Sequence, residues 1–214
     1  MRSTILGAVA VAMTAVSVAS ADLVGTVGGQ TSVLLDLELL AAAANLNLTG
    51  ISDGVIAPGN LGDGSVAFVI TPPTSSVFPT TFNYDTNDFF GTVNGSINHR
   101  GTITFNDVIT VGNFEITLGD GGFVVNDTFG GLGTLFDLGI TSASPSDLTF
   151  DATADLLVSA SFAQALLDLG LASSNLTGAD VGDAWIQGFN QVIPAPGAAA
   201  ILAIAGLVGS RRRR

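Results

Sequence analysis

Short segments in which apolar and polar residues alternate, separated by glycine-rich turns, most constrain the fold of this chain. Residues 114–118 alternate cleanly, and residues 119–122 turn the chain toward the apolar residues 123–125, which together predict a β-hairpin. The chain contains 27 glycines, and its turn signals recur at short intervals. We therefore expect an all-β body with a sandwich or jelly-roll-like fold, and a β-roll or partly open barrel is the alternative.

Further strands are expected where residues alternate or where a short apolar run lies between turn residues. Residues 31–40 alternate and predict a half-buried strand, with a short helix over residues 41–44 as the alternative. Residues 66–71 form an apolar run that predicts a buried strand. Other strands are expected over residues 102–105, 134–140, 148–152, 154–160 and 180–191.

One short capping helix is expected in the body. Ser161 and Gln164 have the spacing of a capping box, with the serine at the N-cap and the glutamine at the third helical position. Apolar residues follow at helical spacing up to Leu169, and Gly170 can end the helix in a left-handed conformation. We expect this helix to cover the sheet or the end of a barrel.

The start of the chain has the layout of a secretory signal peptide. Arg2 gives a short positive region, residues 5–18 are apolar, and Ala19 and Ala21 form an Ala-x-Ala site. We expect the Sec export machinery to recognise residues 1–21 and signal peptidase to cleave between Ala21 and Asp22. The extracytoplasmic body then spans residues 22–191.

The last segment, residues 192–214, combines a proline motif, an apolar run and a basic end. Residues 198–209 carry no charge, and a helix over residues 197–210 would be about 21 Å long at about 1.5 Å per residue. That is shorter than the ~30 Å hydrocarbon core of a bilayer, although terminal arginines can snorkel to the interface. The positive-inside rule leaves these arginines in the cytoplasm and the body outside. A buried helix with a basic tip is the alternative.

These features resemble the PEP-CTERM sorting signal of exosortase substrates. The motif reads Pro194-Ala195-Pro196-Gly197, so alanine replaces the usual central glutamate, and the basic cluster is Arg211, Arg212, Arg213 and Arg214. The resemblance covers about the last tenth of the chain. It implies transient anchoring in the inner membrane, processing near the prolines by an exosortase or archaeosortase-type transpeptidase, and transfer to the cell surface or extracellular matrix.

Charge and the absence of cysteine exclude several functions. Within residues 22–191 Arg100 is the only basic side chain apart from one histidine, and it faces 18 Asp and Glu, so the formal charge is −17. Such a body repels nucleic acid and anionic membrane surfaces, and we expect no nucleic-acid partner. Without cysteine there is no disulfide, thiol nucleophile or thiolate metal site.

Few residues could support catalysis, and we expect no enzymatic activity and no catalytic residues. His99 is the only histidine, and residues 98–101 are typical of a turn. A Ser-His-Asp triad or a zinc site would need this residue, and no Gly-x-Ser-x-Gly elbow is present. A hydrolase with two carboxylates facing across a cleft is a further hypothesis, to which Glu38 and Glu115 could contribute beside the aspartates.

No cofactor is expected, although calcium is the most reasonable metal. Asp85, Asn87 and Asp88 supply oxygen ligands close together in one loop. The alternative is a turn whose Asp and Asn side chains bond their own backbone. The sequence therefore marks these three residues as a candidate calcium site without an EF-hand pattern.

Two functional hypotheses follow. The first is an exported, surface-sorted protein with a non-enzymatic structural or adhesive role in the cell envelope or extracellular matrix. The second is a module that binds extracellular polysaccharide or a small apolar ligand, with or without calcium. The second requires aromatic side chains on one concave face, and Trp185, Tyr84, Phe89 and Phe90 are the candidates.

Overall fold

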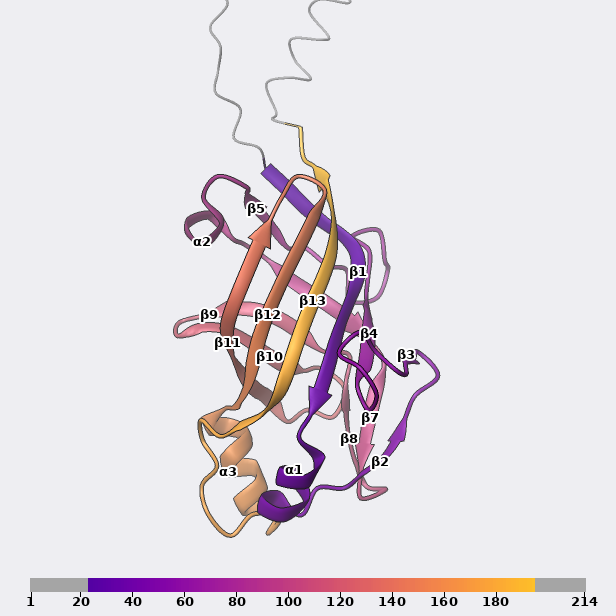
Figure 1. The fold of residues 1–214 in the computed structure, drawn as a ribbon, viewed down its shortest axis with the longest axis vertical. Helices are drawn as coiled ribbons and strands as arrows, with labels where there is room; N and C mark the ends of the chain where they lie inside the picture. The colour runs from indigo at the N-terminus through magenta and orange to yellow at the C-terminus, as the bar shows by residue number, and fades with distance from the viewer. Residues whose placement is uncertain (1–22, 195–214) are drawn as a thin grey trace, which may run out of the picture.

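The computed structural model describes residues 23–194, which are mostly β (Figure 1). This part of the chain forms thirteen strands and three short helices. The strands are β1 (Leu23–Leu35), β2 (Leu48–Ile51), β3 (Val55–Ile56), β4 (Val66–Ile70), β5 (Asn83–Asp85), β6 (Ser96–Arg100), β7 (Thr102–Phe105), β8 (Ile109–Gly112), β9 (Glu115–Gly119), β10 (Gly122–Asp127), β11 (Gly133–Pro145), β12 (Thr149–Val158) and β13 (Asp180–Val192). The helices are α1 (Leu37–Ala44), α2 (Phe89–Thr92) and α3 (Ala160–Asp168).

The main sheet is antiparallel and closes on itself. Its ten strands run in the order β3-β4-β6-β9-β10-β11-β12-β13-β1-β5, and β4 also pairs with β1. That extra pairing joins the eight strands from β4 through β1 into a barrel-like body, while β2, β7 and β8 form a separate sheet. The expectation of a β-rich body is confirmed. The body is barrel-like or sandwich-like, so it combines the expected fold with the alternative.

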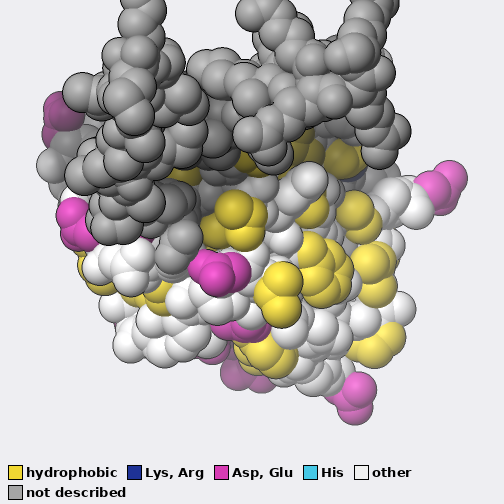
Figure 2. Space-filling view, turned by 90° about the horizontal axis from the view of Figure 1, so that it is seen from above, with side chains coloured by type: hydrophobic (Ala, Val, Ile, Leu, Met, Phe, Trp, Pro, Cys, Tyr) yellow, Lys and Arg dark blue, Asp and Glu magenta, His cyan; other side chains and the backbone are white. Residues whose placement is uncertain are grey.

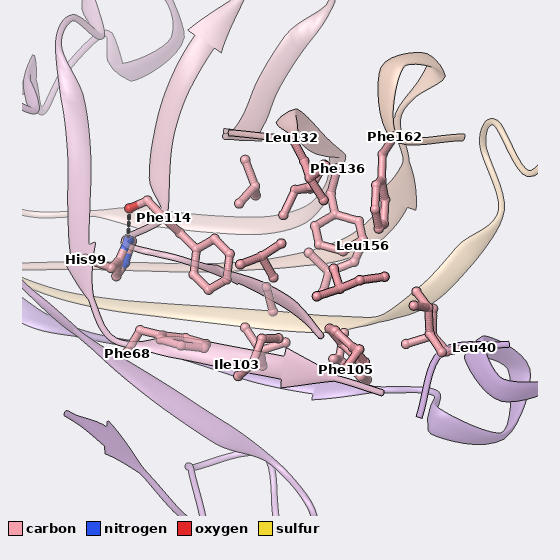
Figure 3. Close-up of a pocket in the computed structure, with 18 of the residues that line it drawn as sticks. Leu40, Phe68, His99, Ile103, Phe105, Phe114, Leu132, Phe136, Leu156 and Phe162 are labelled. Atoms are coloured by element: carbon pink, nitrogen blue, oxygen red, sulfur yellow. Dashed lines mark hydrogen bonds between the residues drawn. The ribbon is translucent and has the colours of Figure 1, made fainter. Parts of the chain in front are cut away.

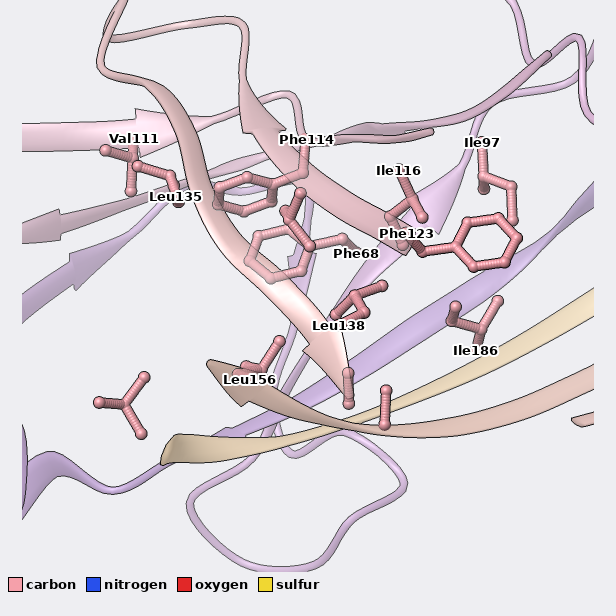
Figure 4. Close-up of a cluster of buried hydrophobic side chains, with 14 of the residues drawn as sticks. Phe68, Ile97, Val111, Phe114, Ile116, Phe123, Leu135, Leu138, Leu156 and Ile186 are labelled. Carbon is pink, nitrogen blue, oxygen red and sulfur yellow. The ribbon is translucent and has the colours of Figure 1, made fainter. Parts of the chain in front are cut away.

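Alternation along the strands builds the interior. In β12, every second residue from Phe150 to Val158 is buried, and the residues between them are partly exposed. The inward side chains of the other strands meet these in one hydrophobic core, part of which Figure 4 shows around Phe68, Phe114 and Leu156. Because side chains alternate between the two faces of a strand, the period-two pattern in the sequence directly selects the residues of this core.

Helix α1 is the first departure from the expected elements. The strand expected over residues 31–40 ends at Leu35, and Asp36 then caps a helix by accepting a hydrogen bond from the Leu39 backbone N–H at 2.9 Å. The four alanines that follow are strong helix formers, so helix propensity overrides the short alternation of leucines. Asn45 ends this helix in the left-handed region with φ of 47°.

Helix α3 is confirmed, but its cap differs from the expected one. Ser159, not Ser161, accepts the hydrogen bond from the Phe162 backbone N–H at 3.1 Å. Ser161 donates to the Thr134 carbonyl instead, and Gln164 donates to Asp168, so no capping box forms. As expected, the chain leaves the helix through a glycine at residue 170 with φ of +68°.

The two ends of the described chain lie side by side. Strands β1 and β13 pair along their length, with Val24 opposite Val192, and the Ile193 N–H donates to the Leu23 carbonyl at 2.7 Å. We call this end of the body the chain end; α1 and α3 lie at the opposite end, the helix end (Figure 1). Within residues 23–194, no helix is both long enough and apolar enough to span a membrane.

The surface at the chain end mixes apolar and acidic side chains. Figure 2 looks onto this end and shows hydrophobic side chains beside Asp and Glu, with no Lys or Arg of the described residues in view. Phe189, Val192 and Ile193 are exposed near the point where β13 ends. The surface at the chain end therefore carries exposed apolar side chains, although the composition of the body is strongly acidic.

Candidate functional site

Most residues of the expected processing sites lie outside the described part of the chain. Pro194 is its last residue and is exposed. The signal-peptidase residues Ala19, Ala21 and Asp22 precede the described range. The rest of the sorting signal, Ala195, Pro196, Gly197 and Arg211 to Arg214, follows it.

An apolar cavity lies at the helix end of the described body (Figure 3). Its volume is about 60 Å³, and it lies between the inner face of the main sheet, the three-stranded sheet and the two helices. Leu40 reaches it from α1, and Phe162 and Leu166 reach it from α3. The other lining residues come from strands and the adjoining turns: Thr31, Val33, Leu35, Leu46, Phe68, His99, Ile103, Phe105, Ile109, Val111, Phe114, Ile116, Val125, Leu132, Leu135, Phe136, Leu138, Leu156, Leu169 and Ala184.

The walls of this cavity are apolar except at one place. Thr31 and His99 are the only polar residues among those that line it. An apolar cavity of this kind stays dry, because water inside it would find too few hydrogen-bond partners. An empty volume of 60 Å³ destabilises the fold by about 1.4 kcal/mol at ~24 cal/mol per Å³. The body therefore carries a measurable packing deficit at the helix end.

His99 is buried in a strand, so the turn expected at residues 98–101 is wrong. It lies in β6 with 1% of its surface exposed, and the strand ends at Arg100, directly before Gly101, which has φ of +114°. Its Nδ1 lies 2.9 Å from the Phe114 carbonyl oxygen, and its Nε2 lies 2.7 Å from the Thr31 hydroxyl. Because a carbonyl only accepts, Nδ1 carries the proton and Nε2 accepts from Thr31.

Burial makes this imidazole a weak base. Loss of hydration lowers the pKa of His99 from 6.5 to about 4, and the hydrogen bond to Phe114 opposes that shift only in part. Thr31 is also buried, and Nδ1 bonds a backbone carbonyl where a catalytic triad has a carboxylate. The geometry therefore fits a satisfied hydrogen-bonded pair inside the core, with a neutral ring at physiological pH.

The candidate calcium loop uses its oxygens for its own backbone. Asp85 Oδ1 accepts from the backbone N–H of Asn87 at 2.9 Å and from its side-chain amide at 3.1 Å. Asp88 Oδ1 accepts from the Gly91 N–H at 3.2 Å and caps α2. Residues 23–194 contain no group of three or more His, Asp or Glu placed to hold a metal ion. Calcium at this loop stays a prediction.

The expected aromatic binding face does not form. Tyr84 and Phe89 are buried at the chain end, where their rings lie 5.0 Å apart, whereas Phe90 is 68% exposed. Trp185 alternates on β13 with the buried Ala184 and Ile186, so its side chain lies on the opposite, outer face of the strand. The aromatic face that the second hypothesis requires is therefore absent among these four residues: Tyr84 and Phe89 are buried, Phe90 is exposed on α2, and Trp185 lies on the outer face of β13.

The sequence did not reveal the cavity. Alternation marks most of its lining residues as inward-facing, but no local pattern shows that β4 pairs with β1 and closes the sheet around them. The pair of Thr31 and His99 is separated by 68 residues and meets only through that closure.

Comparisons with known proteins show a similarity of structure but none of sequence. No protein-family model matches the chain, and no curated protein matches it. Its structure is similar to that of the C-terminal domain of HtaA from Corynebacterium glutamicum, with a TM-score of 0.51 and 16% sequence identity. The match covers 78% of this chain and 99% of that domain. At this identity, the similarity shows that the two proteins share a fold.

Proposed function

We propose that this chain is an exported protein that an exosortase-type transpeptidase sorts to the cell surface or extracellular matrix, where it has a non-enzymatic structural or adhesive role. The observation that carries the proposal is the pairing of β1 with β13, which brings Leu23 and Val192 to one end of the body. Leu23 is the second residue of the chain that signal peptidase is expected to release, and Pro194 begins the sorting motif. The described residues next to both expected processing sites in the sequence thus lie at the chain end, away from the helix end.

The composition of the body supports the same role. A body with a formal charge of −17 remains soluble outside the cell and repels other acidic polymers unless cations or basic partners intervene. The only buried histidine is bonded inside the core, and it offers no accessible base. A closed sheet whose helix end lies away from both ends of the described chain suits a protein that is displayed and makes contacts.

The test is the intact mass of the protein purified from its own host, with the exosortase gene present and deleted. The expected mass in the wild-type host begins at Asp22 and ends near Pro194 to Pro196. In the deletion host, the protein should keep its C-terminus to Arg214. A tail that is retained in both hosts would contradict sorting and leave a simple membrane anchor.

A pair of variants makes this test specific to the motif. The double variant Pro194→Ala/Pro196→Ala should keep the tail even when the exosortase is present. The matched control Pro73→Ala changes a proline in an exposed loop of the body and should be processed like the wild type. Equal processing of both variants would contradict the assignment of the motif.

A further inference from the structure

We propose that the cavity at the helix end is a binding site for a small unbranched aliphatic molecule or for the end of an alkyl chain. The cavity of about 60 Å³ is lined by apolar side chains, apart from Thr31 and His99. Those two residues already bond each other, so neither needs a polar ligand group. The chemistry of the walls therefore selects an apolar occupant.

The size of the cavity narrows the ligand class. Benzene binds in an engineered apolar cavity of about 150 Å³, so a cavity of 60 Å³ has room only for a smaller or slimmer group. Branched or ring-shaped molecules would displace the packed rings of Phe68, Phe114 and Phe162, which surround the cavity in Figure 3. An unbranched chain fits without that rearrangement.

The body fills the comparable space at its other end. Inside the same sheet near the chain end, the remaining void is about 10 Å³, lined by residues such as Phe82, Phe123 and Phe150. Position 184 on β13 faces the larger cavity and holds only an alanine, between Val33 and Ala154 on the neighbouring strands. The short side chain at this position therefore leaves the space beside it unfilled.

The wall of the cavity reaches the surface beside α3. Leu169, directly after this helix, lines the cavity and is 56% exposed, and Phe136 and Leu132 are only partly buried. Phe136 packs edge-on against Phe162 of α3, with ring centroids 5.8 Å apart. The exposed side chain of Leu169 therefore brings this wall of the cavity to the surface.

The experiment uses the chain with its tail, residues 22–214, in phosphatidylcholine nanodiscs, with ¹³C-labelled methyl groups observed by NMR. The probes are xenon, 1-butanol and 1-dodecanol. We expect saturable shifts of the methyl groups of Leu135, Leu138 and Leu156, which line the cavity, and no shift at Ile97, which lines the small void near the chain end. Saturation by xenon and butanol alone identifies small whole molecules as ligands, and saturation by dodecanol identifies the end of an alkyl chain.

Two variants decide whether the shifts report the cavity. Ala184→Val should fill it and weaken the apparent affinity at least tenfold, and the matched control Ala42→Val on the exposed face of α1 should bind like the wild type. If Ala184→Val fails to fold, the titration of the wild type still shows whether the cavity binds the probes. Absence of saturable shifts with all three probes, or unchanged binding in folded Ala184→Val, would overturn the proposal.

Discussion

The two halves of the interior of the closed sheet are packed differently. At the chain end, five aromatic rings pack with centroids 5.0 to 6.3 Å apart and leave a void of about 10 Å³; these are Phe82, Tyr84, Phe89, Phe123 and Phe150. At the helix end, the interior is closed by two helices and a small sheet and keeps about 60 Å³ empty. The interior at the chain end is filled by closely packed aromatic rings, and the interior at the helix end keeps an unfilled cavity.

This difference separates the source of stability from the place where the body can adapt. Aromatic rings bury large areas and gain from edge-to-face contact, so the chain end resists change. A cavity lowers the cost of rearrangement around it, because its lining atoms have already lost contacts. We therefore expect substitutions at the chain end to cost more than those beside the cavity.

The largest expected effect is at the chain end. Phe82→Ala removes a ring that is 2% exposed and contacts four other rings, so the free energy of unfolding should fall by about 3–5 kcal/mol. The measurement is urea unfolding followed by Trp185 fluorescence. Phe90→Ala, which removes an exposed ring nearby, should change stability by less than about 0.5 kcal/mol. A loss below about 1 kcal/mol in Phe82→Ala would contradict tight packing there.

The next effect concerns the polar pair beside the cavity. Thr31→Val and His99→Leu each leave one buried partner without its hydrogen bond, which should lower the free energy of unfolding by about 1–3 kcal/mol. The double variant should cost less than the sum of the two, by about 1 kcal/mol, because neither partner is then left alone. Additive losses in this double-mutant cycle would show that the two side chains do not interact in solution.

The same pair predicts a dependence of stability on pH. The unfolded chain protonates His99 near pH 6.5, whereas the folded chain keeps it neutral down to about pH 4. Its contribution is therefore fully present above pH 6.5 and is lost as pH falls toward 4, by about 2 kcal/mol between pH 7 and pH 5. Unfolding curves at both pH values should show this loss in the wild type, and His99→Leu should lack it. An equal loss in that variant would assign the dependence to the carboxylates.

The smallest expected effect is a gain. Ala184→Val adds two methyl-sized groups inside the cavity and should raise the free energy of unfolding by about 1 kcal/mol. Thermal unfolding measures the change, with Ala42→Val as the surface control. A destabilised Ala184→Val would mean that the space at position 184 cannot accept a side chain and would narrow the contrast between the two halves.

The strands were predictable where the local pattern was strong. The hairpin of β9 and β10, the apolar strand β4 and the last strand β13 all lie where alternation or an apolar run placed them. Strand β6 was missed because its sequence, Ser96–Arg100, is polar yet buried. A loop covers it, and Asn98 donates to the Pro79 carbonyl at 2.9 Å. Polar residues that a distant loop satisfies have no local signature.

The candidate sites divide in the same way. The expected sorting tail and signal peptide rest on contiguous sequence motifs, and they stay predictions because most of their residues lie outside residues 23–194. The cavity depends on the contact between β4 and β1, whose paired residues are more than thirty positions apart. Its only polar members, Thr31 and His99, come from β1 and β6. Such a site follows from the closure of the sheet, which the sequence pattern of a single strand does not contain.

The position of β13 has a mechanical consequence for a displayed protein. This strand is paired on both sides, to β1 and to β12, over most of its length, and the chain leaves the body directly from its end. A pull on Pro194 that is resisted at the helix end acts along the strand, parallel to its two neighbours. The interstrand hydrogen bonds then share the load in shear and cannot open one after another. The strand that leads to the expected tail is thus well placed to bear tension.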